Sequence, residues 1–274
     1  MNILLCGSDG YIGRALYRKL LEFGHNVMCR DISLNPLHDI GNIPAMEYDI
    51  IKYNINCVVN LAAIRSVQEC ENKPLDYCIE TNGIKAIGLY ELAQKHNVKH
   101  VFTSTSAINE YSSNPIPNNY AASKRFAELH MPNAHIVRLN NVIGSYLSYI
   151  PHKNKSLAES IMEAIQGNKE IIIRGNAKRI FNSIDSVINI INNLITYNIP
   201  ANIHHINDGY VCTTTELIKK FEYKYRTNLK LIHHEANSYD AIDSTEGREI
   251  LQHQERYMYS AIESYGGIRY ATDF

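Results

Sequence analysis

The stretch that decides the fold is Gly7-Ser8-Asp9-Gly10-Tyr11-Ile12-Gly13, a GxxGxxG spacing near the start of a chain of 274 residues. Residues 3–6 before it form an apolar run that predicts a strand, and residues 11–23 after it carry apolar side chains at helical spacing. A glycine-rich turn between a strand and a helix lets a pyrophosphate approach backbone N–H groups at the helix N-terminus. The stretch therefore predicts a dinucleotide-binding turn, with contacts from Gly7, Gly10, Tyr11, Ile12 and Gly13.

Beyond this turn, short apolar runs alternate with helical patterns. We expect further strands at residues 26–30, 57–61, 100–103 and 136–139, and helices at residues 75–96 and 120–130. This alternation is typical of βαβ units. It predicts an α/β fold, a Rossmann-type doubly wound parallel sheet, over residues 1–145.

From residue 146 to residue 274 the pattern is less regular. It predicts a small substrate lobe, interleaved with the last sheet elements, that contains helices at residues 156–166, 184–197 and 214–225 and strands at residues 171–174, 204–206 and 230–233. Glu216, just after a threonine run, is expected to cap the helix at 214–225. No role is assigned to residues after about 235.

The composition excludes several classes of function. A net charge of −1 gives no global field for nucleic acid or an anionic membrane. The N-terminal stretch lacks a basic n-region, and no window approaches the roughly 18 to 20 apolar residues of a membrane helix, so a cytoplasmic protein is expected. The six cysteines show no CxxC spacing and are expected to be reduced and packed. The pairs His204-His205 and His233-His234 have no spaced carboxylate or cysteine partner, so no metal site is expected.

Two residues at the end of the second predicted strand bear on the choice of dinucleotide. Asp31 follows the glycine turn by about 20 residues, where a carboxylate accepts hydrogen bonds from the adenosine ribose hydroxyls, which favours NAD. The adjacent Arg30 could instead meet a 2′-phosphate, so NADP stays open.

A second motif is Tyr120-Ala121-Ala122-Ser123-Lys124, which puts a phenol and an ammonium four residues apart on one helix face. The cation should favour the phenolate, so that Tyr120 acts as a base near neutral pH. The motif follows a strand that ends in Thr103-Ser104-Thr105-Ser106. Its position, more than the spacing alone, predicts a catalytic pair.

These motifs, in this order, resemble the extended short-chain dehydrogenase/reductases, and within them the NAD-dependent epimerase/dehydratase group with its nucleotide-sugar 4-epimerases. The resemblance runs from residue 1 to about residue 217. It implies cofactor contacts beyond the glycine turn and Asp31. They are Asp39 and Ile40 at the adenine, Leu61, Ala62 and Ala63 at the phosphates, Arg65, the helix residue Asn82, and Tyr120 with Lys124.

The resemblance also implies the substrate contacts. Thr105, or Ser104 as the alternative, would bind the sugar oxygen that is oxidised. Asn141 would face the substrate diphosphate, and Arg179 would bind the nucleotide-sugar pyrophosphate. Arg179 could instead pair with Asp185 on the surface, and Asn141 could fix a loop. A homodimer is an expectation from the family alone.

The chain departs from the family at several points. The dehydratases place an Asp-Glu pair after the catalytic threonine, whereas Ser106 and Ala107 follow Thr105, which disfavours 4,6-dehydration. The segment between Asp31 and Asp39 is too short for a strand, so one strand of the usual sheet should be missing.

Three functions remain open at this point. The first is a nucleotide-sugar epimerase with retained NAD that oxidises a sugar hydroxyl, most often at C4, transiently. The second is an NAD(P)H-dependent reductase of a 4-keto-6-deoxy sugar nucleotide. The third is a non-catalytic NAD(P)-binding module, against which the register of Thr105, Tyr120 and Lys124 argues.

Overall fold

The computed structural model describes residues 1–108, 116, 118–144, 157–167, 170–174, 176, 178–206 and 209–234. The chain divides into two compact units. The first comprises Met1–Leu139 and Val187–Ile206, and the second draws its described residues from Asn140–Ser186 and Asn207–Phe274. No described helix is both long and apolar enough to cross a membrane.

The first unit is built on a six-stranded sheet in the order β2-β1-β3-β4-β5-β9, in which every neighbouring pair is parallel. Its strands are β1 (Asn2–Cys6), β2 (Asn26–Arg30), β3 (Cys57–Asn60), β4 (Lys99–Thr105), β5 (His135–Leu139) and β9 (Ile203–His205). β3 is buried throughout, as expected of a strand covered on both faces. The predicted Rossmann-type parallel sheet is confirmed.

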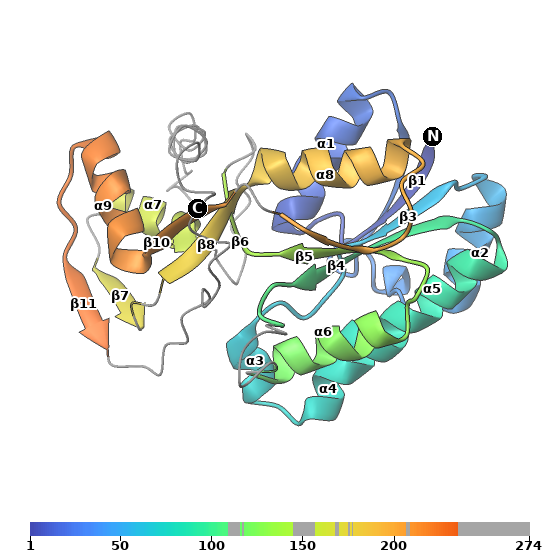
Figure 1. The fold of residues 1–274 in the computed structure, drawn as a ribbon, viewed down its shortest axis with the longest axis horizontal. Coiled ribbons are helices and arrows are strands. Elements are labelled where there is room, and N and C mark those ends of the chain that lie inside the picture. Colours follow the sequence, from blue (N-terminus) through green and yellow to red (C-terminus); the bar gives the residue numbers. More distant parts are fainter. Residues whose placement is uncertain are drawn as a thin grey trace. The chain divides into compact units, whose positions relative to one another are not determined.

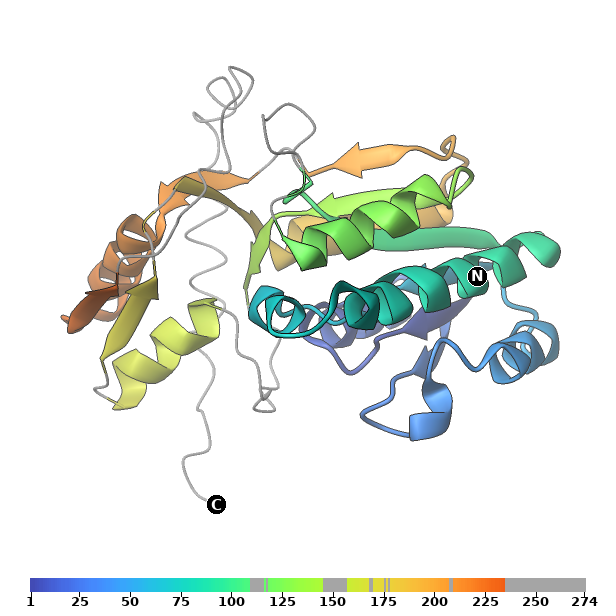
Figure 2. The same cartoon turned by 90° about the horizontal axis from the view of Figure 1, so that it is seen from below.

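Helices cover both faces of this sheet (Figure 1). One face carries α1 (Tyr11–Glu22) and α8 (Ile184–Thr196), and the opposite face, seen in Figure 2, carries α4 (Leu75–Ile79), α5 (Lys85–Lys95) and α6 (Asn119–Leu129). Lys99 holds α8 to the sheet by donating to the carbonyls of Leu194, Ile195 and Tyr197. Each helix buries its apolar stripe, so the core lies on both sides of the strands.

The single helix predicted at residues 75–96 is divided in the structure. A π-helical turn, η2 (Glu80–Ile84), separates α4 from α5. At this turn Asn82 is fully buried, and a Cβ on Gly83 would lie 2.7 Å from Cδ1 of Phe126 in α6. Such turns are frequent at functional sites, and this one brings the backbone close enough to α6 for Asn82 to bond across.

One strand of the usual sheet is missing, as predicted. Between β2 and β3 the chain forms a short 3-10 helix, η1 (Pro36–His38), and the helix α2 (Ile43–Lys52), and this segment contains no strand. Asn35 caps η1 by accepting from the N–H of Leu37. β2 is consequently the edge strand of the sheet.

In its described residues, the second unit holds two small sheets and two helices. β10 (Tyr210–Thr213), β8 (Lys178–Ser183) and β6 (Asn141–Ile143) form one sheet, and β11 (Leu231–His234) pairs with β7 (Ile171–Arg174) in the other. α7 (Leu157–Gly167) and α9 (Thr214–Tyr225) pack into a shared apolar core. Thr213 and Glu216 form a full capping box at α9, which confirms the role predicted for Glu216.

The prediction that all six cysteines are reduced is wrong. Cys70 and Cys78 form a disulfide, with their Cα atoms 5.9 Å apart. It joins α3 (Val67–Glu71) to α4, and both cysteines are fully buried. The two residues lie in neighbouring short helices, a proximity that CxxC spacing could not signal. Cys6, Cys29, Cys57 and Cys212 are free thiols.

Candidate active site

Two glycines of the turn, Gly7 and Gly13, lie where a side chain has no room. Gly7 has a φ of +78°, and a Cβ there would lie 2.7 Å from the N atom of Ala62. A Cβ on Gly13 would lie 2.1 Å from the carbonyl oxygen of Gly7. At Gly10 a Cβ would meet only that same oxygen, at 3.3 Å, so this position keeps an open approach at the N-terminus of α1.

The end of β3, whose residues the resemblance places at the cofactor phosphates, lies against this turn. The N–H of Leu61 donates to the carbonyl of Cys6, at 2.9 Å. The side chain of Asn60 accepts from the N–H of Ala62, at 3.0 Å, while its buried Nδ2 has no hydrogen-bond partner among the described residues. A buried donor without a partner is costly unless a ligand satisfies it. Asn60, which begins the motif at residues 60–63 but was not among the predicted cofactor contacts, therefore fits a site that receives an anion.

Asp31 is held against the glycine turn. Its Oδ2 accepts from the N–H of Asp9, at 2.9 Å, and its Oδ1 accepts from the N–H and the hydroxyl of Ser33. Arg14 in turn binds the carboxylate of Asp9 through Nε and Nη2, at 2.9 and 2.7 Å. The carboxylate of Asp31 is thus oriented at the edge of the turn before any ligand arrives.

Arg30 points to a different partner. Its Nε and Nη2 bind the two carboxylate oxygens of Asp49 in α2, both at 2.5 Å. The hydrogen bond to Asp49 raises the pKa of Arg30 above its ordinary value. In the chain by itself, Arg30 is therefore committed to its ion pair with Asp49.

The carboxyl end of β4 carries three hydroxyl groups, all of them buried. The hydroxyl of Thr103 donates to the carbonyl of Asn60, and that of Thr105 accepts from the N–H of Ala107, at 3.1 Å. The Oγ of Ser104 has no partner within the described part of the chain. Thr105 and Ser104 therefore both keep the capacity to donate a hydrogen bond to a ligand oxygen.

Helix α6 begins at Asn119, one residue before the predicted start. Asn118 caps it by accepting from the N–H of Ala121, at 2.8 Å, so Tyr120 lies in the first turn and Lys124 one turn later. Lys124 is buried to 1% exposure, and its ammonium donates to the carbonyl of Thr103, at 2.9 Å. This bond ties α6 to the end of β4.

The predicted lowering of the pKa of Tyr120 by Lys124 is wrong for the chain by itself. Burial raises the pKa of the Tyr120 phenol to about 12, and the nearby charge of Arg65 acts in the opposite direction. Burial also lowers the pKa of Lys124 to about 7, although Glu128 counteracts this. The reason is that the Lys124 ammonium is directed to the Thr103 carbonyl, in a site that disfavours every charge.

Asn82 and Ser123 form a buried network under α6. Asn82 accepts from the N–H of Ile64, and its Nδ2 donates to the carbonyl of Ile64 and to the hydroxyl of Ser123. Ser123 donates to the carbonyl of Tyr120, at 2.8 Å. Asn82 therefore positions the first turn of α6. Ser123 was missed as a candidate, although its place between Tyr120 and Lys124 offered a signal.

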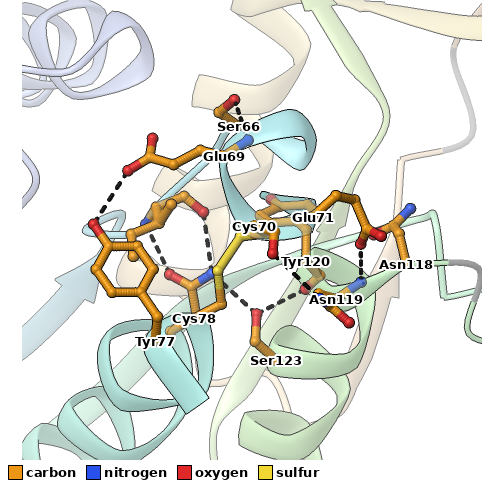
Figure 3. The surroundings of a disulfide bond; sticks show 12 residues. Ser66, Glu69, Cys70, Glu71, Tyr77, Cys78, Asn118, Asn119, Tyr120 and Ser123 are labelled. Atoms are coloured by element: carbon orange, nitrogen blue, oxygen red, sulfur yellow. Dashed lines mark hydrogen bonds between the residues drawn. A yellow bond between two sulfur atoms is a disulfide. The ribbon is translucent and has the colours of Figure 1, made fainter. Parts of the chain in front are cut away.

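The disulfide lies beside the same helical turn (Figure 3). Asn119 donates its backbone N–H to Glu71, at 2.6 Å, and its side-chain amide to the carbonyl of Cys70, at 3.2 Å. The disulfide-linked helices α3 and α4 thus buttress the residue that precedes Tyr120 (Figure 3).

Some predicted cofactor residues have other contacts. Asp39 pairs with Lys85, at 2.9 Å, and Ile40 is buried in the core of the first unit. Arg65 is exposed. Tyr11 and Ile12, in the first turn of α1, are half-buried.

The predicted substrate residues of the second unit lie on neighbouring strands. Asn141, on β6, is exposed, and its amide donates to the carbonyl of Ile180, at 3.3 Å. Arg179, on β8, is half-buried and forms no ion pair with Asp185 within the described residues. The alternative in which Arg179 pairs with Asp185 is therefore not seen in this structure.

A family model described as the NAD dependent epimerase/dehydratase family matches residues 3–207. The chain belongs to this family. A UDP-glucose 4-epimerase of Bos taurus is 27% identical over 192 residues, which cover 54% of this chain and 55% of the relative. One of Caenorhabditis elegans is 28% identical over 134 residues, covering 39% of this chain and 38% of the relative. The chain thus matches about half the length, or less, of these curated relatives.

Solved structures agree on the fold. A UDP-glucose 4-epimerase of Thermotoga maritima, solved with UDP-glucose, has a TM-score of 0.80 at 22% identity and covers 97% of this chain and 99% of its own. A dTDP-4-dehydrorhamnose reductase of Bacillus anthracis, in complex with NADP, has a TM-score of 0.78 at 17% identity and covers 97% and 98%. At these sequence identities the structural similarity establishes the fold alone.

Because the family is NAD-dependent, the cofactor expected at this site is a nicotinamide dinucleotide. The residues present fit that group. The open approach at Gly10, the unpartnered Nδ2 of Asn60 and the fixed carboxylate of Asp31 would hold its pyrophosphate and its adenosine ribose.

Proposed function

We propose that this chain is an NAD-dependent nucleotide-sugar 4-epimerase that keeps its cofactor through the catalytic cycle. The observation that carries the proposal is the joint position of Thr105, Tyr120 and Lys124 about the carboxyl end of β4, to which the Lys124–Thr103 bond ties α6. Ligands of open α/β sheets bind outside the carboxyl ends of the strands.

The roles follow from the groups that each residue offers. The bound nicotinamide would supply the hydride acceptor. Tyr120 would take the proton of the sugar hydroxyl, while the hydroxyl of Thr105, or of Ser104 in its place, holds the sugar oxygen in position. Lys124 would hold the cofactor ribose and supply positive charge near the phenol. Because burial raises the pKa of Tyr120 to about 12, the phenol is neutral in the free enzyme, and Arg65 and Lys124 must favour its ionised form during the reaction.

In the second unit, Arg179 and Asn141 would bind the diphosphate of the nucleotide sugar. Arg179 offers a guanidinium on β8, and Asn141 offers an amide on the neighbouring strand β6. Guanidinium groups suit the planar, bidentate recognition of phosphate oxygens. A diphosphate ligand would thus give the half-buried guanidinium of Arg179 an anionic partner.

A reductase of a 4-keto-6-deoxy sugar nucleotide is the second candidate. The specific observation in its favour is the similarity to the Bacillus anthracis reductase along almost the whole of both chains. The same catalytic residues would serve it, with Tyr120 delivering its proton, as a neutral phenol can. Exchange of cofactor on every turnover separates this candidate from the epimerase.

The test measures both retained cofactor and turnover. Mass spectrometry of small molecules released from the denatured, purified protein should find NAD near one per chain, and the protein should interconvert a nucleotide sugar with its C4 epimer, for which UDP-glucose is the first probe. Tyr120→Phe should keep the NAD and lose about 10²–10⁴-fold in turnover. An empty site with NADPH-dependent reduction of a keto sugar would favour the reductase instead. Unchanged turnover in Tyr120→Phe would remove Tyr120 from the chemistry.

A further inference from the structure

The choice between NAD and NADP depends on one phosphate group. The two cofactors differ only at the 2′ position of the adenosine ribose, where NAD has a hydroxyl and NADP a phosphate. A carboxylate at this position accepts a hydrogen bond from the 2′-hydroxyl of NAD, and an arginine nearby binds the 2′-phosphate of NADP. This chain places both kinds of group side by side in sequence, Asp31 and Arg30, so the sequence alone leaves the choice open.

The ion pair between Arg30 and Asp49 removes one of the two options. It is bidentate, with both bonds at 2.5 Å, and Asp49 is fully buried while the side chain of Arg30 is 20% exposed. Bidentate arginine–carboxylate pairs are among the strongest hydrogen-bonded contacts. Turning Arg30 towards a ligand would leave a buried carboxylate unpaired, which is strongly disfavoured.

The surroundings of Asp31 favour the hydroxyl in addition. Two carboxylates, Asp9 and Asp31, share contacts with Ser33. The cation beside them, Arg14, is bound to Asp9 through two nitrogens. A 2′-phosphate would therefore meet negative charge at the turn, with both neighbouring arginines already engaged.

The missing strand explains how Asp49 comes to lie there. The chain leaves β2 and enters η1 and α2 without forming another strand, so β2 is an edge of the sheet. Asp49 comes from α2 and reaches the last residue of β2. The acidic partner of Arg30 thus belongs to the segment in which this chain departs from the usual sheet.

We propose that Asp49 is a specificity-determining residue: by holding Arg30 in a buried ion pair it denies the 2′-phosphate of NADP a cation and leaves Asp31 to bind the ribose hydroxyls of NAD. This inference rests on the proposed function in assuming that the glycine turn binds the dinucleotide. Asp49 does not touch the cofactor and acts only through Arg30. Released from Asp49, the long side chain of Arg30 would be able to reach the ribose next to Asp31.

The experiment is a fluorescence titration of the purified full chain, stripped of bound cofactor, with NADH and with NADPH. Wild-type protein should bind NADH more tightly. Asp49→Asn should tighten NADPH binding about tenfold, the value of one charged hydrogen-bonded contact, and change the Kd for NADH less than about threefold. Glu47→Gln is the matched control, because it removes one carboxylate from the same helix, where Glu47 pairs with Lys95 and not with Arg30. It should leave both affinities unchanged.

A double variant keeps the inference testable even where Asp49→Asn does not fold. Arg30→Gln combined with Asp49→Asn replaces the ion pair by two neutral side chains of similar size. It should bind NADH and NADPH in the wild-type ratio, since Arg30 does not contact either cofactor in the wild-type protein. It should also lack the gain for NADPH seen in Asp49→Asn alone.

The outcomes separate the two proposals. A folded Asp49→Asn that binds NADH normally without tighter NADPH binding overturns the role of Asp49 and leaves the proposed function intact. A double variant with a changed ratio also overturns it, because Arg30 must then already contact the cofactor. Wild-type protein that binds neither dinucleotide overturns the proposed function, and this inference with it.

Discussion

The residues predicted to hold the cofactor and those predicted to hold the substrate differ in how firmly the fold fixes them. In the first unit, Asp31, Asn82 and Lys124 each form hydrogen bonds to the backbone of a distant segment, and Asn82 and Lys124 are fully or almost fully buried. In the second unit, Asn141 is exposed and makes one bond of 3.3 Å, and Arg179 is half-buried.

This difference matches the demands on the two regions. A cofactor that is the same throughout a family can be met by groups built into the core, where misplacement is costly. A substrate that varies is met by side chains on strand surfaces, which can be exchanged at little cost to stability. Mutations should therefore couple stability to binding in the first unit and separate them in the second.

The largest effect is expected at the glycine turn. In Gly13→Ala the new Cβ would lie 2.1 Å from the Gly7 carbonyl oxygen and 2.8 Å from Cα of Ser8, so backbone must move. We expect a loss of about 3 kcal/mol or more in the free energy of unfolding, with NADH binding lost as well. Thermal denaturation and NADH titration measure both.

Gly88→Ala is the control for this substitution. Its Cβ would meet Cδ1 of Ile43 at 3.4 Å, an ordinary contact, inside helix α5. Its unfolding free energy should stay within about 1 kcal/mol of wild type. Normal NADH binding by Gly13→Ala would show that the turn does not hold the dinucleotide.

The next effect concerns Lys124, whose pKa is lowered to about 7 by burial. In the unfolded chain the ammonium keeps its proton to about pH 10.4, so between these values the unfolded state binds more protons and stability rises with pH. Below pH 7 the folded protein bears the full cost of the buried charge. Lys124→Met removes this cost, at the loss of the bond to Thr103.

Urea unfolding at pH 6 and at pH 9 checks the sign. The stability of Lys124→Met relative to wild type should be a few kcal/mol higher at pH 6 than at pH 9, while turnover is lost at both. Lys95→Met, at a side chain that is 65% exposed, should show no such change with pH. Equal differences at the two pH values would mean that the ammonium is well solvated.

The sequence predicted most of the first unit because local patterns decide it. The GxxGxxG stretch, the apolar strand at Cys57–Asn60 and the capped start of α6 each specify their structure within a few residues. The helix predicted at 75–96 had the right extent, yet nothing local signalled the π-helical turn, since Asn82 bonds Ile64 and Ser123 far along the chain.

The remaining features depend on contacts between distant segments. β6, β8 and β10 were not predicted, because they are short and their partners are far along the chain. Asn141 pairs with Phe181, 40 residues on, and Phe181 pairs with Tyr210, 29 residues on. The partner of Arg30 lies 19 residues on, in a helix that was not predicted. The Cys70–Cys78 pair depends on how two short helices pack.

That disulfide should have a smaller effect than the buried ammonium. Replacing Cys70 and Cys78 by serine removes a link across a separation of eight residues, which should lower the free energy of unfolding by about 2–3 kcal/mol. Turnover should fall several-fold, because Asn119, next to Tyr120, bonds the Cys70 carbonyl and Glu71. Dithiothreitol should reproduce the loss in wild type and leave the double variant unaffected; equal sensitivity of both would exclude this disulfide as the cause.

The smallest effect on stability is expected in the second unit. Arg179→Gln should raise the KM for the nucleotide sugar about tenfold, as expected for the loss of one charged contact to the diphosphate. It should leave the Kd for NADH unchanged and the unfolding free energy within about 0.5 kcal/mol of wild type, since Arg179 is half-buried on β8 and forms no ion pair with Asp185 in the described residues.

Lys178→Gln, which replaces the preceding cation on the same strand, is the control, because the alternation of a strand directs the Lys178 side chain to the other face. A KM that responds equally to both changes would indicate a diffuse electrostatic effect, whereas a response at Arg179 alone, with stability untouched, would separate substrate binding from folding.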